Sequence, residues 1–206
     1  GHIIGSACVH LRITDNGKTE SLTFSGDIGR YRDIILRSPD VFPQADYIIM
    51  ESTYGNSLHE MQFTTPNHLL EWVERTCIKK KGKLIIPAFS VGRTQEMLYF
   101  IREIKAEHLV HGYGEFPVYV DSPLAVEATN IFRDHQKECY DSDAAALLAQ
   151  GINPILFPGL KLSITSDESK AINFNETPKV IISASGMCDA GRIKHHLKHN
   201  LWDSRN

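Results

Sequence analysis

The sequence lacks the features that assign many proteins to a class at sight. None of its apolar runs is as long as a membrane span, so we expect no membrane as a partner. The four cysteines are widely spaced and form no CxxC pair, which argues against a zinc ribbon or a disulfide framework. The remaining interpretation is a set of reduced thiols in a cytoplasmic protein.

Positive charge is not in excess either. The chain has 22 lysines and arginines against 25 aspartates and glutamates, which gives a net charge of −3. A protein that coats nucleic acids in general should be basic, so this balance argues against that class. It is compatible with an enzyme that has a local basic cleft, and residues 177–206 do carry more basic than acidic side chains.

The start of the sequence has the pattern of a β-structure. Residues 7–13 alternate between apolar and polar side chains, which predicts a half-buried strand. The turn signal Asp-Asn-Gly follows at 15–17, and a second strand runs to residue 24, so a hairpin is expected. Residues 46–51 form a short apolar run that predicts a buried strand ending on a carboxylate.

Later in the chain, the pattern changes to alternating strands and helices. An amphipathic helix comes first, and a unit of strand, small-residue loop and helix then appears three times. Such alternation predicts an α/β fold with a mostly parallel sheet flanked by helices, and we expect residues 1–52 to pack as strands at its edge. Residues 153–175 show no clear pattern. The three units are 82–104, 116–132 and 178–197.

Three of the predicted loops follow the carboxyl ends of parallel strands, where open sheets bind their ligands. Each loop leads into the N-terminus of a helix, whose free N–H groups and positive dipole suit an anion such as the phosphodiester backbone. The alternative is that each serine only caps its helix, which is the more common role of a single such residue. The candidate phosphate-binding residues are Ser90, Arg93, Ser122, Ser183, Ser185 and Gly186.

A second group of side chains suggests a metal site. His2, Asp27 and Glu51 each lie beside a predicted strand, and a His and an Asp at strand ends are suitable metal ligands. Taken singly, each is more often an ordinary surface residue. His195 and His199 have the i, i+4 spacing of a metal-binding pair on a helix, but no third ligand accompanies them, so a solvated helix face is the preferred interpretation.

Five segments in a fixed order together resemble the β-CASP branch of the metallo-β-lactamase superfamily, whose members include RNA-processing nucleases. Each motif is weak alone, but the five in this order are specific, and they cover nearly the whole chain. They are GHIIGSA (1–7), FSGDIGR (24–30), ESTYG (51–55), IPAFSVGRTQE (86–96) and SASGMCDAGR (183–192).

The resemblance implies roles for individual residues. His2 corresponds to a histidine that binds one zinc ion, and Asp27 to an aspartate that bridges two. Glu51 corresponds to an acid that orients neighbouring catalytic groups, so Asp27 and Glu51 are the candidate catalytic residues. Arg93 and the loop that contains Ser185 correspond to parts of the cassette that face the RNA. Two zinc ions in the complete protein would activate water for attack on phosphorus.

The departures from the family pattern carry their own expectations. The HxHxDH motif that supplies most zinc ligands is absent, and so are two later histidines. We therefore expect an internal fragment, with residues 1–55 as part of a metallo-β-lactamase domain and 56–206 as a β-CASP domain that is incomplete at its C-terminus. Such a chain should bind zinc weakly or not at all and should be inactive alone.

The resulting hypothesis is a fragment of a zinc-dependent ribonuclease that hydrolyses phosphodiester bonds in RNA processing or decay. Its expected partner is single-stranded RNA, and the sequence leaves a homodimer open. One alternative is a non-catalytic β-CASP homologue that acts as a scaffold or an RNA-binding partner. Another is a small-molecule hydrolase, which would not need the long cassette. Endonuclease and exonuclease action are not distinguished by these residues.

Overall fold

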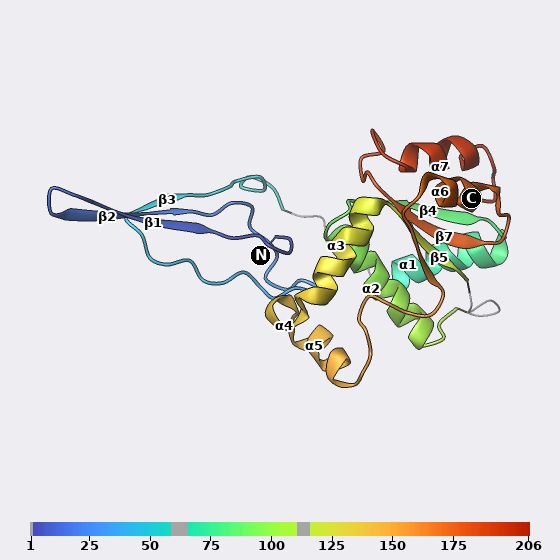
Figure 1. The fold of residues 1–206 in the computed structure, drawn as a ribbon, viewed down its shortest axis with the longest axis horizontal. Coiled ribbons are helices and arrows are strands. Elements are labelled where there is room, and N and C mark those ends of the chain that lie inside the picture. The colour runs from blue at the N-terminus through green and yellow to red at the C-terminus, as the bar shows by residue number, and fades with distance from the viewer. Residues whose placement is uncertain (1, 59–65, 111–115) are drawn as a thin grey trace.

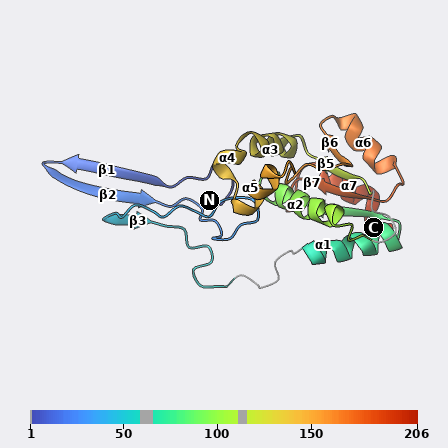
Figure 2. The ribbon, with the colours of Figure 1, turned by 90° about the horizontal axis from the view of Figure 1, so that it is seen from below.

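The computed structural model describes residues 2–58, 66–110 and 116–206. It has two parts, shown in Figure 1. A long arm comprises residues 2–55, and an α/β unit comprises residues 66–110 and 116–206. The two views in Figures 1 and 2 agree that the arm projects away from the unit. No helix in the described part of the chain is long and apolar enough to cross a membrane.

The α/β unit is built on a four-stranded sheet in which all neighbouring strands are parallel. This confirms the predicted fold class. The three expected strands are present, and a fourth lies in the stretch whose pattern was unclear. The strands, in their order across the sheet, are β4 (Lys83–Pro87), β7 (Lys179–Ser183), β5 (Val118–Asp121) and β6 (Leu160–Ser163).

Helices cover both faces of this sheet, as a parallel sheet requires. In Figure 1, α1 and α2 lie on one side of the sheet, and α6 and α7 lie on the other. A π-helix over Glu74–Lys79 continues α1. The helices are α1 (Pro66–Val73), α2 (Arg93–Ala106), α3 (Pro123–Asp134), α4 (Gln136–Cys139), α5 (Ser142–Ala149), α6 (Ser166–Phe174) and α7 (Ile193–Asn200).

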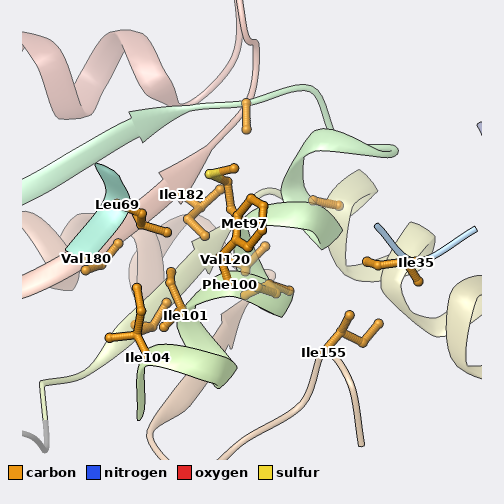
Figure 3. Close-up of a cluster of buried hydrophobic side chains, with 14 of the residues drawn as sticks. Ile35, Leu69, Met97, Phe100, Ile101, Ile104, Val120, Ile155, Val180 and Ile182 are labelled. Atoms are coloured by element: carbon orange, nitrogen blue, oxygen red, sulfur yellow. The ribbon is translucent and has the colours of Figure 1, made fainter. Parts of the chain in front are cut away.

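The main core lies between the sheet and helices α1 and α2 (Figure 3). Alternate residues of β7, Val180 and Ile182, join this core, together with Ile101 and Ile104 from α2, and all four are fully buried. Burying a side chain of this size contributes about 1.5–3 kcal/mol. The unit therefore carries enough buried apolar surface to position its loops firmly.

The arm contains a three-stranded sheet of its own, formed by β1 (Val9–Asp15), β2 (Lys18–Phe24) and β3 (Tyr47–Ile49). The predicted hairpin is present, with β1 and β2 antiparallel and β3 parallel to β2. Three expectations differ from the structure. The strand predicted to be half-buried at residues 7–13 is largely exposed. The run 46–51, predicted to be a buried strand, forms β3, whose three residues are all exposed because no described residue covers the apolar face of the arm. The arm also does not pack along the edge of the four-stranded sheet, since its strands pair only with one another.

A short segment of the arm is anchored in the α/β unit. Ile35 and Leu36 are buried in the main core, and the backbone N–H of Arg37 donates to the carbonyl of Cys139. The Arg37 side chain adds a bond from Nε to the carbonyl of Tyr140 (2.9 Å). The division at residue 55 stays a prediction, and these contacts fix the base of the arm against α4.

Candidate active-site cleft

A cleft of about 640 Å³ lies where the arm meets the α/β unit. Its lining brings together side chains that are far apart in the sequence. The arm contributes His2, Asp27 and Glu51, and the loop after β4 and the start of α2 contribute Phe89 and Arg93. The residues predicted to act on a metal therefore share one cleft with the residue predicted to meet a phosphate.

His2 and Asp27 face each other in this cleft. Their nearest atoms, Nε2 of His2 and Oδ2 of Asp27, are 4.0 Å apart, and the side chains are 50% and 76% exposed. Asp27 follows Gly26, whose φ of +59° is a conformation that favours glycine. The backbone conformation of the turn before Asp27 thus explains why the FSGDIGR segment has a glycine at position 26.

Glu51 holds the backbone beside Asp27. Its Oε1 accepts a hydrogen bond from the N–H of Ile28 (2.7 Å), and its Oε2 accepts one from the hydroxyl of Thr53 (2.7 Å). These bonds, the one from Ile28 first, lower the pKa of Glu51. Glu51 is therefore ionised at neutral pH, and its carboxylate ties β3 to the segment that carries Asp27.

The donor set is only partly suited to zinc. An imidazole nitrogen and a carboxylate oxygen are ligands that zinc accepts, but a structural or catalytic site has at least three protein ligands. Among the residues that the structure describes, no group of three or more His, Cys, Asp or Glu side chains is placed to hold a metal ion. The pair of His2 and Asp27 is therefore too small to make a zinc site by itself, and their role as ligands stays a prediction.

Two guanidinium groups lie along one side of the cleft. Arg93 Nη1 contacts Glu96 Oε2 at 2.6 Å, and Arg30 Nη2 contacts Glu96 Oε1 at 3.3 Å and Asp33 Oδ1 at 3.2 Å. Glu96 is 9% exposed, whereas Arg93 keeps 45% of its side chain exposed. The buried carboxylate therefore fixes Arg93 while much of its guanidinium remains accessible to an anion.

The predicted phosphate-binding serines have partners within the protein. Ser90 and Ser122 are buried with their hydroxyl oxygens 3.2 Å apart, and Ser122 caps α3 by accepting from the N–H of Ala125. The hydroxyl of Ser183 donates to the carbonyl of Asp121 (2.8 Å), and that of Ser185 donates to Asp189 Oδ1 (2.5 Å). Helix capping explains Ser122, and phosphate binding by these serines stays a prediction.

A buried polar network, which the sequence did not reveal, lies at the end of β5. Asp121 Oδ2 accepts from His196 Nε2 (2.7 Å) and Ser169 Oγ (2.6 Å), and its Oδ1 accepts from Arg192 Nη1 (2.7 Å). Burial raises the pKa of Asp121, but these hydrogen bonds, the one from His196 first, outweigh it and hold the pKa at about 2. This network joins β5, α6, α7 and the loop before α7.

Only a spatial arrangement reveals the network, because its members are separated by up to 75 positions in the sequence. The available signal was Asp121 itself, a carboxylate placed directly after an apolar strand. His195 and His199, which have the metal-pair spacing, lie exposed on α7, whereas His196 between them is fully buried. The solvated-face interpretation of the pair agrees with this placement.

The loop between β7 and α7 has two glycines at positions where a side chain would meet neighbouring atoms. A side-chain carbon at Gly191 would lie 2.4 Å from the carbonyl oxygen of Ala184, and the residue has a φ of +76°. A side-chain carbon at Gly186 would lie 3.0 Å from the ring of Phe89. The small residues of SASGMCDAGR thus let the loop close on itself and come close to the loop after β4.

Comparison with known proteins connects this cleft to a family. A model of the β-CASP domain matches residues 94–206. A ribonuclease of Thermus thermophilus is 36% identical over 100% of the chain and 45% of its own length. The transcription termination factor FttA of Methanosarcina mazei is 34% identical, and an endoribonuclease of Kluyveromyces lactis is 28% identical.

Each of these relatives matches the whole chain, but they are much longer than it. The chain spans 45% of the Thermus ribonuclease, 32% of the Methanosarcina factor and 26% of the Kluyveromyces endoribonuclease. The family match covers more than half of the chain and includes almost all of α2, every helix and strand that follows it, and the network around Asp121. The chain therefore belongs to the β-CASP family of the metallo-β-lactamase superfamily.

Proposed function

We propose that this chain forms one side of the active site of a zinc-dependent ribonuclease that hydrolyses phosphodiester bonds in single-stranded RNA. The observation that carries the proposal is the shared cleft, which unites His2, Asp27 and Glu51 with Arg93. The relatives named ribonuclease and endoribonuclease support the same reaction.

The arm would supply the metal-binding side of the reaction. His2 and Asp27 would be the residues of this chain that hold zinc. The chemistry that zinc brings to such a site is charge neutralisation on phosphate oxygens and acidification of a water near neutral pH. Glu51 acts through the backbone, because its bond to Ile28 holds the residue next to Asp27 in place.

The proposed zinc site depends on ligands beyond this pair. His2 and Asp27 provide two donors, and an open two-donor site holds zinc poorly. We therefore expect the 206-residue chain to bind zinc weakly and the complete gene product to bind two ions. Elemental analysis of both after gel filtration tests this, and tightly held zinc in the 206-residue chain would contradict it.

Arg93 would contact the RNA backbone. Its guanidinium is held by Glu96 at 2.6 Å, and its exposed part lies in the same cleft as Asp27. A fork of N–H donors suits a phosphate group, and an attraction of this kind weakens as salt rises.

The first test is a cleavage assay with labelled single-stranded RNA and the complete gene product. Replacing Asp27 with Ala should remove nearly all cleavage, because the proposed metal site loses its carboxylate ligand. Asp15→Ala changes an exposed carboxylate of the β1–β2 turn and serves as the control. Undiminished cleavage by the Asp27 variant would refute the metal assignment.

A second test separates binding from chemistry. Arg93→Ala should weaken RNA binding at low salt, with a smaller loss at high salt. Arg133→Ala is the matched control, because this arginine is also half exposed and paired with a neighbouring acid, Asp134, but does not line the cleft. Equal effects of the two variants would show that Arg93 contributes only general charge.

The alternative function is that of a non-catalytic RNA-binding or scaffold protein. A complete gene product that binds zinc and RNA but leaves the RNA intact would support this alternative over the nuclease.

A further inference from the structure

Phe89 is a large aromatic side chain that remains exposed inside the cleft. Its exposed fraction is 55%, and it lines the same cavity as His2, Asp27 and Arg93. A single exposed apolar residue on a convex surface needs no explanation. An exposed ring within a cleft that also holds proposed metal ligands is a different case, because apolar and aromatic groups in such places usually contact the ligand.

The backbone of Phe89 is firmly held. Its carbonyl accepts hydrogen bonds from the hydroxyl of Thr94 (2.8 Å) and from the N–H of Thr94 (3.3 Å), in the first turn of α2. The preceding residue, Ala88, donates from its N–H to the carbonyl of Ser183 (3.1 Å), which joins this loop to the end of β7. The backbone at Phe89 is therefore held to the first turn of α2 and, through Ala88, to the end of β7.

The ring is supported by the glycine loop. A side-chain carbon at Gly186 would lie 3.0 and 3.1 Å from the ring carbons Cδ2 and Cε2 of Phe89. Only a residue without a side chain leaves the ring its present place. The backbone of Gly186 thus supports one edge of the ring, while more than half of the side chain stays open to the cleft.

The neighbours of Phe89 define what its open surface is suited to bind. Arg93 lies four positions along the chain, at the start of α2, and its guanidinium lines the same cleft. A flat aromatic surface beside a cation suits a ligand with both a planar ring and a phosphate. The bases of an unpaired strand offer such rings, whereas paired bases in a helix are stacked and covered.

We propose that Phe89 is a stacking platform for one unpaired base of the RNA substrate, kept in place by Gly186. This inference rests on the proposed function and adds to it a reason for selecting single strands. Stacking is tolerant of sequence because every base has a π-face, so the contact selects an unpaired base and not a particular one.

The test uses the complete gene product without zinc and a short single-stranded RNA that contains 2-aminopurine. Stacking on an aromatic ring quenches the fluorescence of this base, so the wild type should quench it on binding. Phe89→Leu keeps an apolar side chain against Gly186 but removes the aromatic face. It should lose the quenching and weaken binding roughly 5- to 150-fold, with little dependence on salt.

Two further variants make the outcome specific. Phe89→Trp should restore both quenching and affinity, because the larger ring also stacks. Gly186→Ala should reduce both, because the added carbon displaces the ring. Binding of a fully paired duplex should not change in the Leu variant. If Phe89→Leu binds single strands like the wild type and still quenches, the stacking proposal is wrong.

The same set of measurements distinguishes failure of this inference from failure of the nuclease proposal. Quenching that depends on Phe89, in a protein that never cleaves RNA, would leave stacking intact and refute the nuclease. If Phe89→Leu cleaves RNA with an unchanged KM, the nuclease proposal stands and the stacking proposal is refuted. Loss of thermal stability in Phe89→Leu without loss of quenching would show that the ring serves folding, and would overturn the inference.

Discussion

The arm and the α/β unit use similar apolar strand residues with opposite results. In β1, the side chains of Val9 and Ile13 are 49% and 56% exposed, whereas Val180 and Ile182 of β7 are fully buried. The sheet of the unit has helices on both faces, and no described residue covers the apolar face of the arm. An apolar pattern therefore shows which face of a strand is suited to burial. It does not show which part of a protein covers that face.

The cleft needs both regions for different reasons. The unit contributes Phe89 and Arg93 from loops fixed by a buried core, and such sites are held precisely. The arm contributes His2 and Asp27 from exposed turns. Substitutions in the two regions should accordingly differ, with stability changing in the unit and activity or association changing in the arm.

The largest expected effect compares two aspartates. Asp121→Ala should lower the free energy of unfolding by about 3–5 kcal/mol, because it leaves the partly buried Arg192 and the fully buried His196 without their shared carboxylate. Asp27→Ala should change it by less than about 0.5 kcal/mol, because its side chain is 76% exposed. Urea unfolding of the 206-residue chain measures both, and equal losses would contradict the division between the two regions.

A second prediction compares two isoleucines in strands. Ile182→Ala should cost about 2–5 kcal/mol, because it opens a cavity in the main core. Ile13→Ala in the arm should stay within about 0.5 kcal/mol, since its side chain already contacts solvent. The measurement is again urea unfolding. A large loss for the arm variant would mean that another copy or segment covers its face in solution.

A third prediction concerns the loss of stability at low pH. The pKa of Asp121 is about 2 in the folded chain against an ordinary value of 3.8, so its contribution is complete above pH 4. It should be lost as the pH falls from 4 to 2 and amounts to about 2 kcal/mol. Unfolding free energies at pH 6 and near pH 2.5 should show this decrease. In Asp121→Asn, the unfolding free energy should decrease less between these two pH values. A decrease as large as that of the wild type would show that Asp121 is not its source.

Much of the fold was accessible from the sequence because its signals are local. Apolar runs followed by small residues and a helical pattern located β4, β5 and β7 with their helices. β6 and α6 were missed in residues 153–175, because β6 is only four residues long and three of them are partly or fully exposed. The position of the arm was also missed, since local alternation does not state what covers a strand.

The site was predictable to a different extent. His2, Asp27 and Glu51 share a cleft with Arg93, but their recognition required a resemblance, since each alone is an ordinary surface residue. Asp121 and His196 are 75 positions apart and meet only in the folded chain. The contact of Gly186 with Phe89 likewise joins two loops that no sequence spacing connects. Such long-range pairs set the geometry and leave little trace in a single sequence.

The smallest expected change in stability again concerns the arm, and it comes with a change in association. Leu11 is 47% exposed and lies opposite Leu22 in the register, on the same face as Val9 and Ile13. An exposed apolar face with open strand edges favours self-association. Leu11→Lys should therefore leave the unfolding free energy within about 0.5 kcal/mol and reduce light scattering at high protein concentration. Thr14→Lys adds the same charge on the other face and is the matched control; if it reduces scattering equally, net charge is the cause and the apolar face is not.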